Sequence, residues 1–284
     1  MPYVINGSIS LDTKIFRYMD LSKFLSLIHQ KYLFFAKTSS FEDRLEGMPT
    51  KLDGFMGSGV AEMLDIVMNN VLPGLARDSS PDERAKREAE RDAAKKKFSN
   101  RTISTVFGPQ RVEDYPNYSS LFESVSHWVD ISCWHMDVAA AESMATWKIY
   151  GSGSAAVCIE STVGDVIAAM DIPQDIQLVA DKVSYLNFES DYVGIDSPLS
   201  VFFQKNGWYE FEKEFRFILH KATSLDPRSE RNGYGTNIAI KPDSLIKRVM
   251  VSPASSAWFL DLVGLIVKEA GLKSEVVKSK IPLR

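Results

Sequence analysis

The chain has 284 residues, of which 45% are hydrophobic and 25% are charged, and its formal net charge is −4. These proportions are those of a soluble globular protein, and the acidic balance argues against a general nucleic-acid-binding surface. The N-terminal sequence lacks the basic stretch and apolar core of a signal peptide. No apolar run reaches the roughly 18 residues that a membrane helix needs. We therefore expect a cytoplasmic protein without membrane contact.

The first part of the chain predicts a strand, a helix and a second strand. Lys14–Tyr18 is rich in aromatic and branched residues, which is typical of a strand. Asp20 stands before Leu21–Gln30, where apolar residues recur at helical spacing, so it is expected to cap a helix. Tyr32–Phe35 predicts the next strand. Thr38–Gly47 predicts a polar loop with acidic residues at positions 42, 43 and 46.

The segment Asp78–Lys97 is dense in charges of both signs. Opposite charges recur three and four residues apart, which supports an exposed helix, and the serines before Pro81 suit its start. We predict one domain over residues 1–284 with a charged helical insertion at about 76–100. A solvated insertion is favoured over a partner-binding arm. A further helix is predicted over Val60–Val71.

The remaining patterns predict both strands and helices. The predicted strands are Val129–His135, Ser154–Ile159, one or two within Ile176–Leu186, Asn237–Lys241, Ile246–Ser252 and Val276–Ser279. The predicted helices are Leu121–Asp130, Ala139–Ile149, Thr162–Met170, one that ends in Ser200–Asn206, and Ala257–Ala270 with Gly271 as its C-cap. We therefore predict an α+β fold with a central mixed or antiparallel sheet flanked by helices.

The stretch Trp208–Leu219 carries Glu210, Glu212 and Glu214 at alternate positions, followed by Arg216. Residues two apart share one face of a strand, so these side chains are expected to line one side. Because like charges repel one another, either a partner of opposite charge stabilises this group or the group has a catalytic role. The simpler interpretation is an exposed strand face with one internal ion pair.

The histidines and cysteines do not indicate a metal site. No histidine pair has the spacing of a zinc-binding helix, so we predict no metal. Cys133 and Cys158 fit neither a metal motif nor a disulfide framework and are expected to be buried thiols.

Two further features suit ligand binding. Trp147 and Tyr150 stand three apart on a predicted helix, where they either pack in the core or form a stacking wall for a flat ring. Arg17 lies in a strand between Phe16 and Tyr18, so it needs an anionic partner. That partner is either a carboxylate or a ligand phosphate.

The ordered set of short motifs resembles a bacterial family of uncharacterised proteins, the domain of unknown function 2971 family. The resemblance covers most of the chain. The sequence departs from the family pattern after Phe41, and the charged segment resembles an insertion. The motifs that carry the resemblance are Phe16-Arg-Tyr, Ser40-Phe-Glu-Asp, Ile131-Ser-Cys-Trp-His, Met144-Ala-Thr-Trp-Lys-Ile-Tyr and Trp208-Tyr-Glu-Phe-Glu-Lys-Glu-Phe-Arg.

A second resemblance is to ADP-ribosyltransferases. In their arginine–serine–glutamate branch, an arginine on the first strand holds the dinucleotide, and a late Glu-x-Glu pair holds the ribose and the acceptor. Arg17 corresponds to the first role and Glu212-Lys-Glu214 to the second, with Glu210 as an additional candidate. The middle Ser-Thr-Ser motif is not present as such, and Ser154 is expected to open the central strand in its place. The other residues that the resemblance places beside the cofactor are Tyr18, Trp147 and Tyr150.

This second resemblance implies that NAD is a substrate. Loss of nicotinamide leaves an oxocarbenium-like ribose, which a glutamate stabilises. The implied function is an NAD-consuming transferase or glycohydrolase of ADP-ribosyltransferase-like fold, acting as a toxin or antiphage effector on a protein or nucleic-acid acceptor.

Two alternatives stay open at this point. One is a metal-dependent nuclease that uses Glu210, Glu212 and Glu214 together with Asp43. The other is a non-catalytic sensor or scaffold of a defence system, whose charged segment contacts a partner.

Overall fold

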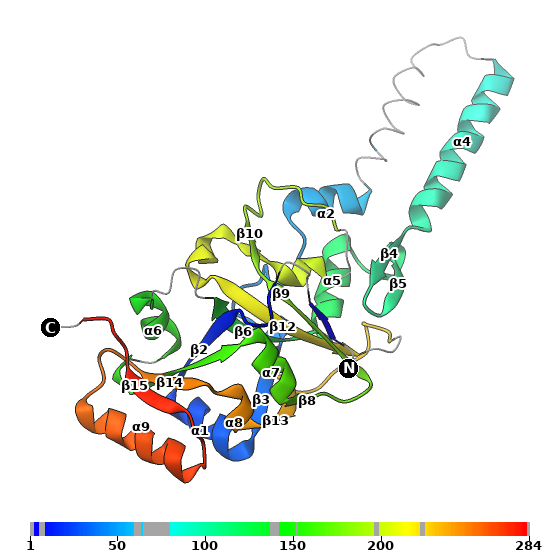
Figure 1. Ribbon diagram of the computed structural model, residues 1–284. Helices are drawn as coiled ribbons and strands as arrows, with labels where there is room; N and C mark the ends of the chain where they lie inside the picture. The colour runs from blue at the N-terminus through cyan, green and yellow to red at the C-terminus, as the bar shows by residue number, and fades with distance from the viewer. Residues whose placement is uncertain are drawn as a thin grey trace.

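The computed structural model describes residues 3–5, 9–59, 64, 80–136, 142–151, 153–195, 199–221 and 225–282. In this part the chain forms a mixed α+β fold, as predicted (Figure 1). The strands are β1 Tyr3–Ile5, β2 Lys14–Asp20, β3 Tyr32–Lys37, β4 Thr102–Thr105, β5 Gly108–Arg111, β6 Asp130–Met136, β7 Ala156–Thr162, β8 Met170–Asp171, β9 Ile176–Lys182, β10 Ser184–Leu186, β11 Gln204–Asn206, β12 Glu214–Lys221, β13 Gly235–Ile240, β14 Arg248–Val251 and β15 Glu275–Lys278.

The helices lie between these strands. The α-helices are α1 Leu21–Gln30, α2 Lys51–Ser58, α4 Pro81–Ser99, α5 Tyr118–Ser126, α6 Met144–Tyr150, α7 Val163–Ala169, α8 Pro242–Leu245 and α9 Ala257–Glu269. The 3-10 helices are η1 Thr38–Ser40, η3 Val112–Asp114, η4 Gly153–Ala155, η5 Ser200–Phe203 and η6 Gly207–Glu212. Among the described residues, no helix combines the length and apolar character needed to cross a bilayer.

The main sheet is mixed and forks at β6. One path runs in the order β1-β9-β12-β6-β2-β7-β14-β15, while β3, β13 and β8 branch from it. The C-terminal end of β6 pairs with β2, where Phe16 lies opposite His135, and its N-terminal end pairs with β3, where Ala36 lies opposite Ile131. Pairing is antiparallel except for β1 with β9 and β14 with β15. The predicted mixed sheet is therefore confirmed.

The two faces of this sheet have separate cores. The larger core packs side chains of α1, α7, α8 and α9 against one face, with Phe215 and Phe217 of β12 among its members. On the other face α5 packs beside Ile218, and α6 packs beside Phe16 of β2. Alternate residues of one strand thus reach different cores, as a period of two requires.

Several predicted elements are confirmed, among them one helix start and one helix end at the residues that predicted them. Asp20 caps α1 by accepting a hydrogen bond from the Lys23 amide at 2.8 Å. Gly271 follows α9 with a φ of 72°, in the left-handed region that glycine favours. The predicted strand over Val129–His135 corresponds to β6.

The charged segment forms the helix α4, which projects from the body of the molecule in Figure 1. Ser80 and Glu83 bond to each other's backbone amides at its start, as a capping box does. That this segment is an insertion stays a prediction. The sequence patterns missed the β4–β5 hairpin that follows it. The helix predicted over Val60–Val71 lies outside the described residues, apart from Leu64.

The helix predicted to end in Ser200–Asn206 is wrong. The chain forms the short helix η5 and then the strand β11, which pairs in parallel with β10.

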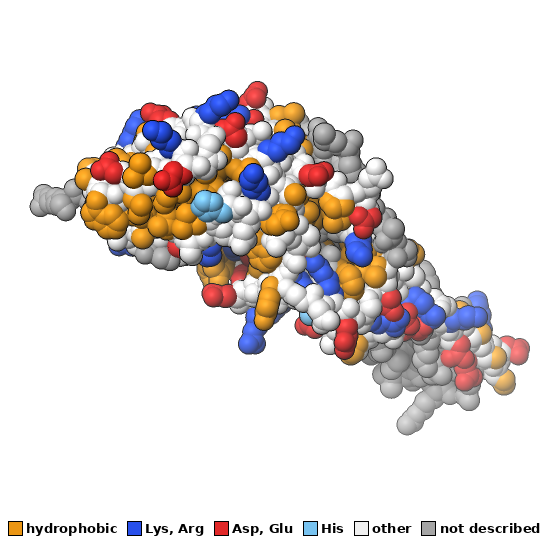
Figure 2. All heavy atoms as spheres, turned by 90° about the horizontal axis from the view of Figure 1, so that it is seen from below, with side chains coloured by type: hydrophobic (Ala, Val, Ile, Leu, Met, Phe, Trp, Pro, Cys, Tyr) orange, Lys and Arg blue, Asp and Glu red, His pale blue; other side chains and the backbone are white. Residues whose placement is uncertain are grey.

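Hydrophobic side chains gather on the underside of the molecule (Figure 2), where α9 exposes Trp258, Leu262 and Leu265. These three residues form a stripe at helical spacing beside the buried face of α9.

Candidate functional site

The glutamates of Trp208–Leu219 do not share the face of one strand, so that prediction is wrong. Glu210 and Glu212 lie in η6, and β12 begins only at Glu214. Lys213 between them is in the left-handed region with a φ of 45°, which interrupts the alternation of an extended chain. Glu210 is exposed and pairs with Lys213 at 3.1 Å. Glu212 and Glu214 instead turn inward.

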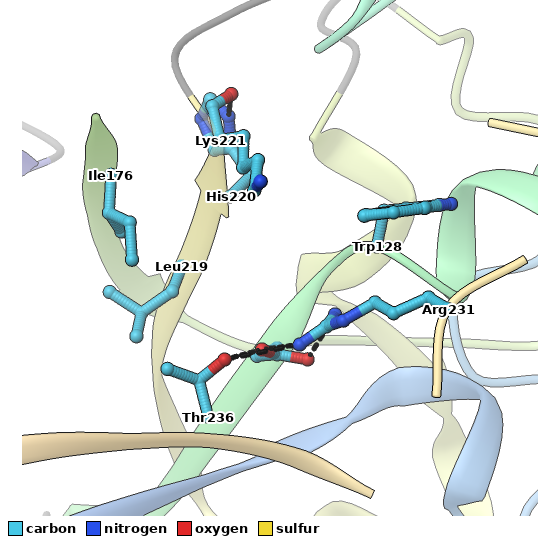
Figure 3. A pocket seen from close by; sticks show the side chains of 8 residues that line it. Trp128, Ile176, Leu219, His220, Lys221, Arg231 and Thr236 are labelled. Carbon is cyan, nitrogen blue, oxygen red and sulfur yellow. Dashed lines mark hydrogen bonds and ion pairs between the residues drawn. The ribbon is translucent and has the colours of Figure 1, made fainter. Parts of the chain in front are cut away.

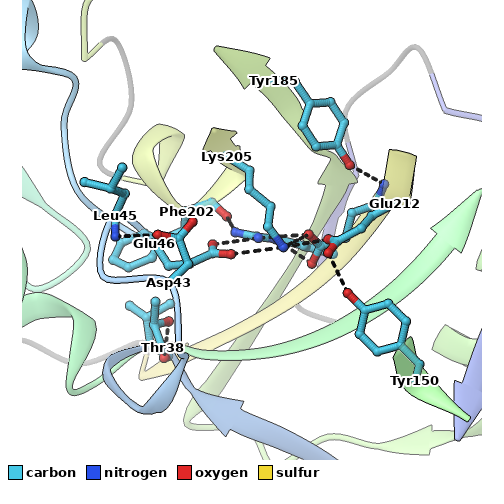
Figure 4. A network of polar contacts seen from close by, with 12 residues as sticks. Thr38, Asp43, Leu45, Glu46, Tyr150, Tyr185, Phe202, Lys205 and Glu212 are labelled. Atoms are coloured by element: carbon cyan, nitrogen blue, oxygen red, sulfur yellow. Dashed lines mark hydrogen bonds and ion pairs between the residues drawn. The ribbon is translucent and has the colours of Figure 1, made fainter. Parts of the chain in front are cut away.

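A buried group of charges forms where Glu212 and Glu214 meet residues from other elements (Figure 4). Its centre is Lys205, whose ammonium lies 2.6 Å from Glu212, 3.3 Å from Glu214 and 3.2 Å from Glu46. Arg216, which is fully buried, pairs with Glu214 at 2.9 Å and with Glu46 at 2.6 Å. We call these five residues the Lys205 cluster.

Glu46 enters the cluster from the loop that follows η1. Thr38 anchors this loop, because its hydroxyl donates to the Val129 carbonyl at 2.8 Å. Gly47 then turns the chain with a φ of +74°, and a Cβ there would lie 2.7 Å from a ring carbon of Phe202. Only glycine meets both requirements without strain. The close approach matters because the Phe202 carbonyl accepts a hydrogen bond from Arg216 at 2.7 Å.

The charges of the cluster support one another. Burial disfavours the ammonium of Lys205, yet the surrounding carboxylates raise its pKa above the usual value. Burial also disfavours the charged form of Glu214, but Arg216 and Lys205 hold its pKa at about 2. Burial raises the pKa of Glu46, against the opposing effect of Arg216 and Lys205. Buried charges persist only when they are paired in this way.

Glu212 stands at the edge of the cluster with both carboxylate oxygens held. The Tyr150 hydroxyl donates to one oxygen at 2.6 Å, and Lys205 donates to the other at 2.6 Å. Burial and the neighbouring Glu212 raise the pKa of Tyr150, so its hydroxyl stays protonated and remains a donor. The carboxylate therefore has a fixed orientation and a cation on one side.

Three partly exposed rings form a row that begins beside Glu212, and we call them the ring strip: Tyr150, His135 and Tyr18. Ring centroids are 5.4 Å apart for Tyr18 and His135, and 5.0 Å apart for His135 and Tyr150. The Glu212 carbonyl accepts a hydrogen bond from His135 Nδ1 at 2.7 Å. Because Nδ1 carries the proton, Nε2 keeps its lone pair. Burial lowers the pKa of His135, so the imidazole is neutral at pH 7.

Arg17 leaves the sheet on the opposite face. Phe16 and Glu214 both lie directly opposite His135 in their pairings with β6. Directly paired residues share a face, and Arg17, as the neighbour of Phe16, takes the other one. The predicted convergence of Arg17 with Glu212 and Glu214 on one face is therefore not observed.

The guanidinium of Arg17 lies at the fork between β2 and β3. It donates to the Ser132 hydroxyl at 3.2 Å and to the Phe34 carbonyl at 3.5 Å. It also lies 5.8 Å from the ring centroid of Trp134. Desolvation lowers its pKa from the usual value. No carboxylate of the described residues forms an ion pair with it.

Two other predicted contact residues take different places. Trp147 is 1% exposed and donates from its indole to Glu142 at 3.1 Å, so it has no open face for stacking and belongs to the core. Ser154 does not open the central strand, because it lies exposed in η4 and β7 begins at Ala156.

Of the two cysteines, Cys158 is buried, and Cys133 is only partly buried, on the side of the sheet that Glu214 faces. Burial raises the pKa of both thiols, so both stay protonated.

Lys205, Glu46 and His135 were not predicted as site residues. Lys205 and Glu46 are far apart in the sequence and meet only through the fold. The acidic residues of the 38–47 loop were visible, but nothing local separates Glu46 from Glu42 or Asp43. For His135 the alternation of β6 was a usable signal, since it places the ring on a definite face.

The predicted carboxylate group of a metal-dependent nuclease does not assemble. Glu210 faces solvent beside Lys213, while Glu212 and Glu214 contact Lys205. Within the described ranges, no group of three or more His, Cys, Asp or Glu side chains is arranged to hold a metal ion.

No protein-family model matches the chain, and no curated protein sequence matches it. The resemblance to the domain of unknown function 2971 family thus stays a prediction. A structure of Thermus sp. 2.9 DarT in complex with carba-NAD+ shows a weak likeness, with 10% identity, a TM-score of 0.34, and coverage of 96% of this chain and 98% of that chain. A structure of the same protein in complex with ADP-ribosylated ssDNA has 9% identity, a TM-score of 0.35 and coverage of 95% of each chain.

Proposed function

We propose that the protein consumes NAD, transferring or hydrolysing its ADP-ribose at the Glu212 carboxylate. The observation that carries this proposal is the fixation of Glu212 between the Tyr150 hydroxyl and the Lys205 ammonium, beside the ring strip. A carboxylate held in this way suits a reaction whose transition state gains positive charge.

Cleavage of the bond between nicotinamide and ribose is such a reaction. The bonding electrons leave with nicotinamide, which departs as a neutral molecule, and the ribose becomes oxocarbenium-like, as a sugar does in glycoside hydrolysis. Glu212 would stabilise that cation. Lys205 places a positive charge beside Glu212, and Tyr150 keeps the carboxylate in place.

The second half of the reaction needs a base and a place for a flat ring. A hydroxyl of water or of an acceptor attacks the ribose and must lose its proton. None of the described contacts occupies Nε2 of neutral His135, so this nitrogen can accept that proton. The partly exposed rings of Tyr18 and Tyr150 would stack against nicotinamide or adenine.

Arg17 has a separate part in the proposal. Its guanidinium at the fork of the sheet has no carboxylate partner among the described residues, and guanidinium binds phosphate through two parallel hydrogen bonds. Because Arg17 lies on the face of the sheet opposite Glu212, a phosphate that it binds would lie away from the Glu212 carboxylate. A toxin or antiphage role, with a protein or nucleic-acid acceptor, would follow from NAD consumption or from modification of that acceptor.

The test is incubation of the purified protein with NAD, with and without protein and nucleic-acid acceptors, followed by measurement of nicotinamide release. The proposal predicts release that rises with protein concentration. Arg17→Gln, which changes the opposite face of the sheet, should leave nicotinamide release nearly unchanged. Absence of release under every acceptor condition would count against the proposal.

A further inference from the structure

A second site lies at the opposite end of β12 from Glu214. There the structure has a partly open hollow of about 60 Å³, and Figure 3 shows the side chains that line it. Its lining includes Trp128, Ile176, Leu219, His220, Lys221 and Arg231. Seven steps of extended strand separate Lys221 from Glu214, which is roughly 24 Å. The hollow is therefore distinct from the Lys205 cluster.

One wall of the hollow is polar, and its charged groups already have partners within the protein. Arg231 donates to both carboxylate oxygens of Asp130, at 2.9 and 2.5 Å. Thr236 donates to the same carboxylate at 2.6 Å. The guanidinium of Arg231 also lies 5.7 Å from the ring centroid of Trp128, which fixes its plane. This wall is rigid, and its ion pair is neutral.

His220 and Lys221, the last two residues of β12 in the lining, have capacity left for a ligand. His220 is 7% exposed, and its Nδ1 donates to the Lys221 carbonyl at 2.9 Å. A carbonyl only accepts, so Nδ1 carries the proton, and burial lowers the pKa of His220, so Nε2 of the neutral ring carries a lone pair. Figure 3 shows the imidazole projecting from β12 on the side of Trp128. The ammonium of Lys221, in the last residue of β12, forms no ion pair with any residue that the structure describes.

These two side chains determine which ligands suit the hollow. Nε2 of neutral His220 accepts a hydrogen bond from a donor on the ligand, and the exposed ammonium of Lys221 favours an anion. Ile176 and Leu219 supply apolar lining, which favours a carbon chain over a bare inorganic ion. The volume is that of about two water molecules in the liquid, so the enclosed part of the ligand has only a few atoms.

We propose that this hollow binds a small carboxylate that carries a hydroxyl or amino group. The carboxylate pairs with Lys221, the hydroxyl or amino hydrogen is donated to His220 Nε2, and the short carbon chain lies against Ile176 and Leu219. The proposal is independent of the NAD reaction.

Three probes separate the parts of this proposal: lactate, propionate and inorganic phosphate. Propionate lacks the donor that His220 needs, and phosphate lacks the carbon chain. A titration by ligand-observed NMR on the full chain should show lactate binding about tenfold more tightly than propionate, since one hydrogen bond is worth about that factor. Phosphate should bind more weakly than lactate.

Two variants and a control complete the test. His220→Phe keeps a ring but removes Nε2, so lactate and propionate should bind equally. Lys221→Met should weaken both by about fivefold, the effect of one exposed charge pair. Lys241→Met, at an exposed position beyond the far end of β13, should bind as the unchanged protein does. Equal binding of lactate and propionate by the unchanged protein, tighter phosphate binding, or an unaffected Lys221→Met variant would overturn the proposal.

Discussion

Tyr150 donates its hydroxyl hydrogen to the Glu212 carboxylate over 2.6 Å, although 62 residues separate the two along the chain. The contact joins α6 to η6, and it sets a neutral donor on one carboxylate oxygen while Lys205 occupies the other. Glu212 is thereby held in one orientation with a cation beside it.

Replacing Tyr150 by Phe removes the neutral donor and leaves one Glu212 oxygen without its partner. We expect the free energy of unfolding to fall by about 1–2 kcal/mol, the cost of an unmatched buried acceptor, and nicotinamide release to fall about tenfold. Urea unfolding and the NAD assay measure these effects. Tyr234→Phe is the matched control, because Tyr234 is 81% exposed and its loss should change stability by less than about 0.5 kcal/mol.

Lys205→Met should be far more damaging than Lys213→Met. The first leaves the buried carboxylates of Glu46 and Glu212 without their shared cation, and the expected loss is about 3–5 kcal/mol. The second removes an exposed pair with Glu210, which is worth less than about 1 kcal/mol. Chemical denaturation of both variants compares them. Equal stabilities would mean that the Lys205 cluster does not hold these elements together.

The Glu214 carboxylate predicts its own loss of stability in acid. The pKa of Glu214 is about 2 in the folded protein against a usual 4.5, so the unfolded chain takes up a proton first as the pH falls. The stability that Glu214 contributes is therefore present above about pH 4.5 and lost toward pH 2. Unfolding free energies measured at steps from pH 6 to pH 3 should fall more steeply for the unchanged protein than for Glu214→Gln. Parallel curves would contradict the pairing of Glu214 with Arg216.

Gly47→Ala tests the loop that delivers Glu46. The new Cβ would lie 2.7 Å from a ring carbon of Phe202 and would sit at a φ of +74°. We expect destabilisation by more than about 1 kcal/mol. Gly264→Ala in α9 is the control, since its Cβ meets nothing within 4 Å and alanine favours a helix interior by roughly 0.5–1 kcal/mol. A thermal melt that shifts both variants upward would show that the turn at Gly47 tolerates a side chain.

Local signals in the sequence predicted local structure well. Asp20 before α1 and Gly271 after α9 act within one turn of a helix, so each is visible without knowledge of the fold. The inward turn of Glu212 was not visible. It depends on Lys213 in a left-handed conformation, which a lysine adopts only when its surroundings impose it.

The site itself depends on contacts between distant segments. Glu46, Lys205 and Glu214 come from a loop and two strands of different sheets, and no spacing rule connects them. The placement of Arg17 is different, because alternation alone sets it on the face opposite Tyr18. The sequence therefore contained the reason why Arg17 and Tyr18 do not share a face, and the grouping of both in one site overlooked it.

The comparison of Glu212→Gln with Glu210→Gln tests the central claim most directly. Both changes remove one negative charge from η6, but Glu212 is 5% exposed and held by Tyr150 and Lys205, whereas Glu210 is exposed beside Lys213. Nicotinamide release from NAD should fall at least about a hundredfold in Glu212→Gln, as for loss of a group that acts in the transition state, and should be unchanged in Glu210→Gln. Equal rates in a folded Glu212→Gln variant and the unchanged protein would contradict the account.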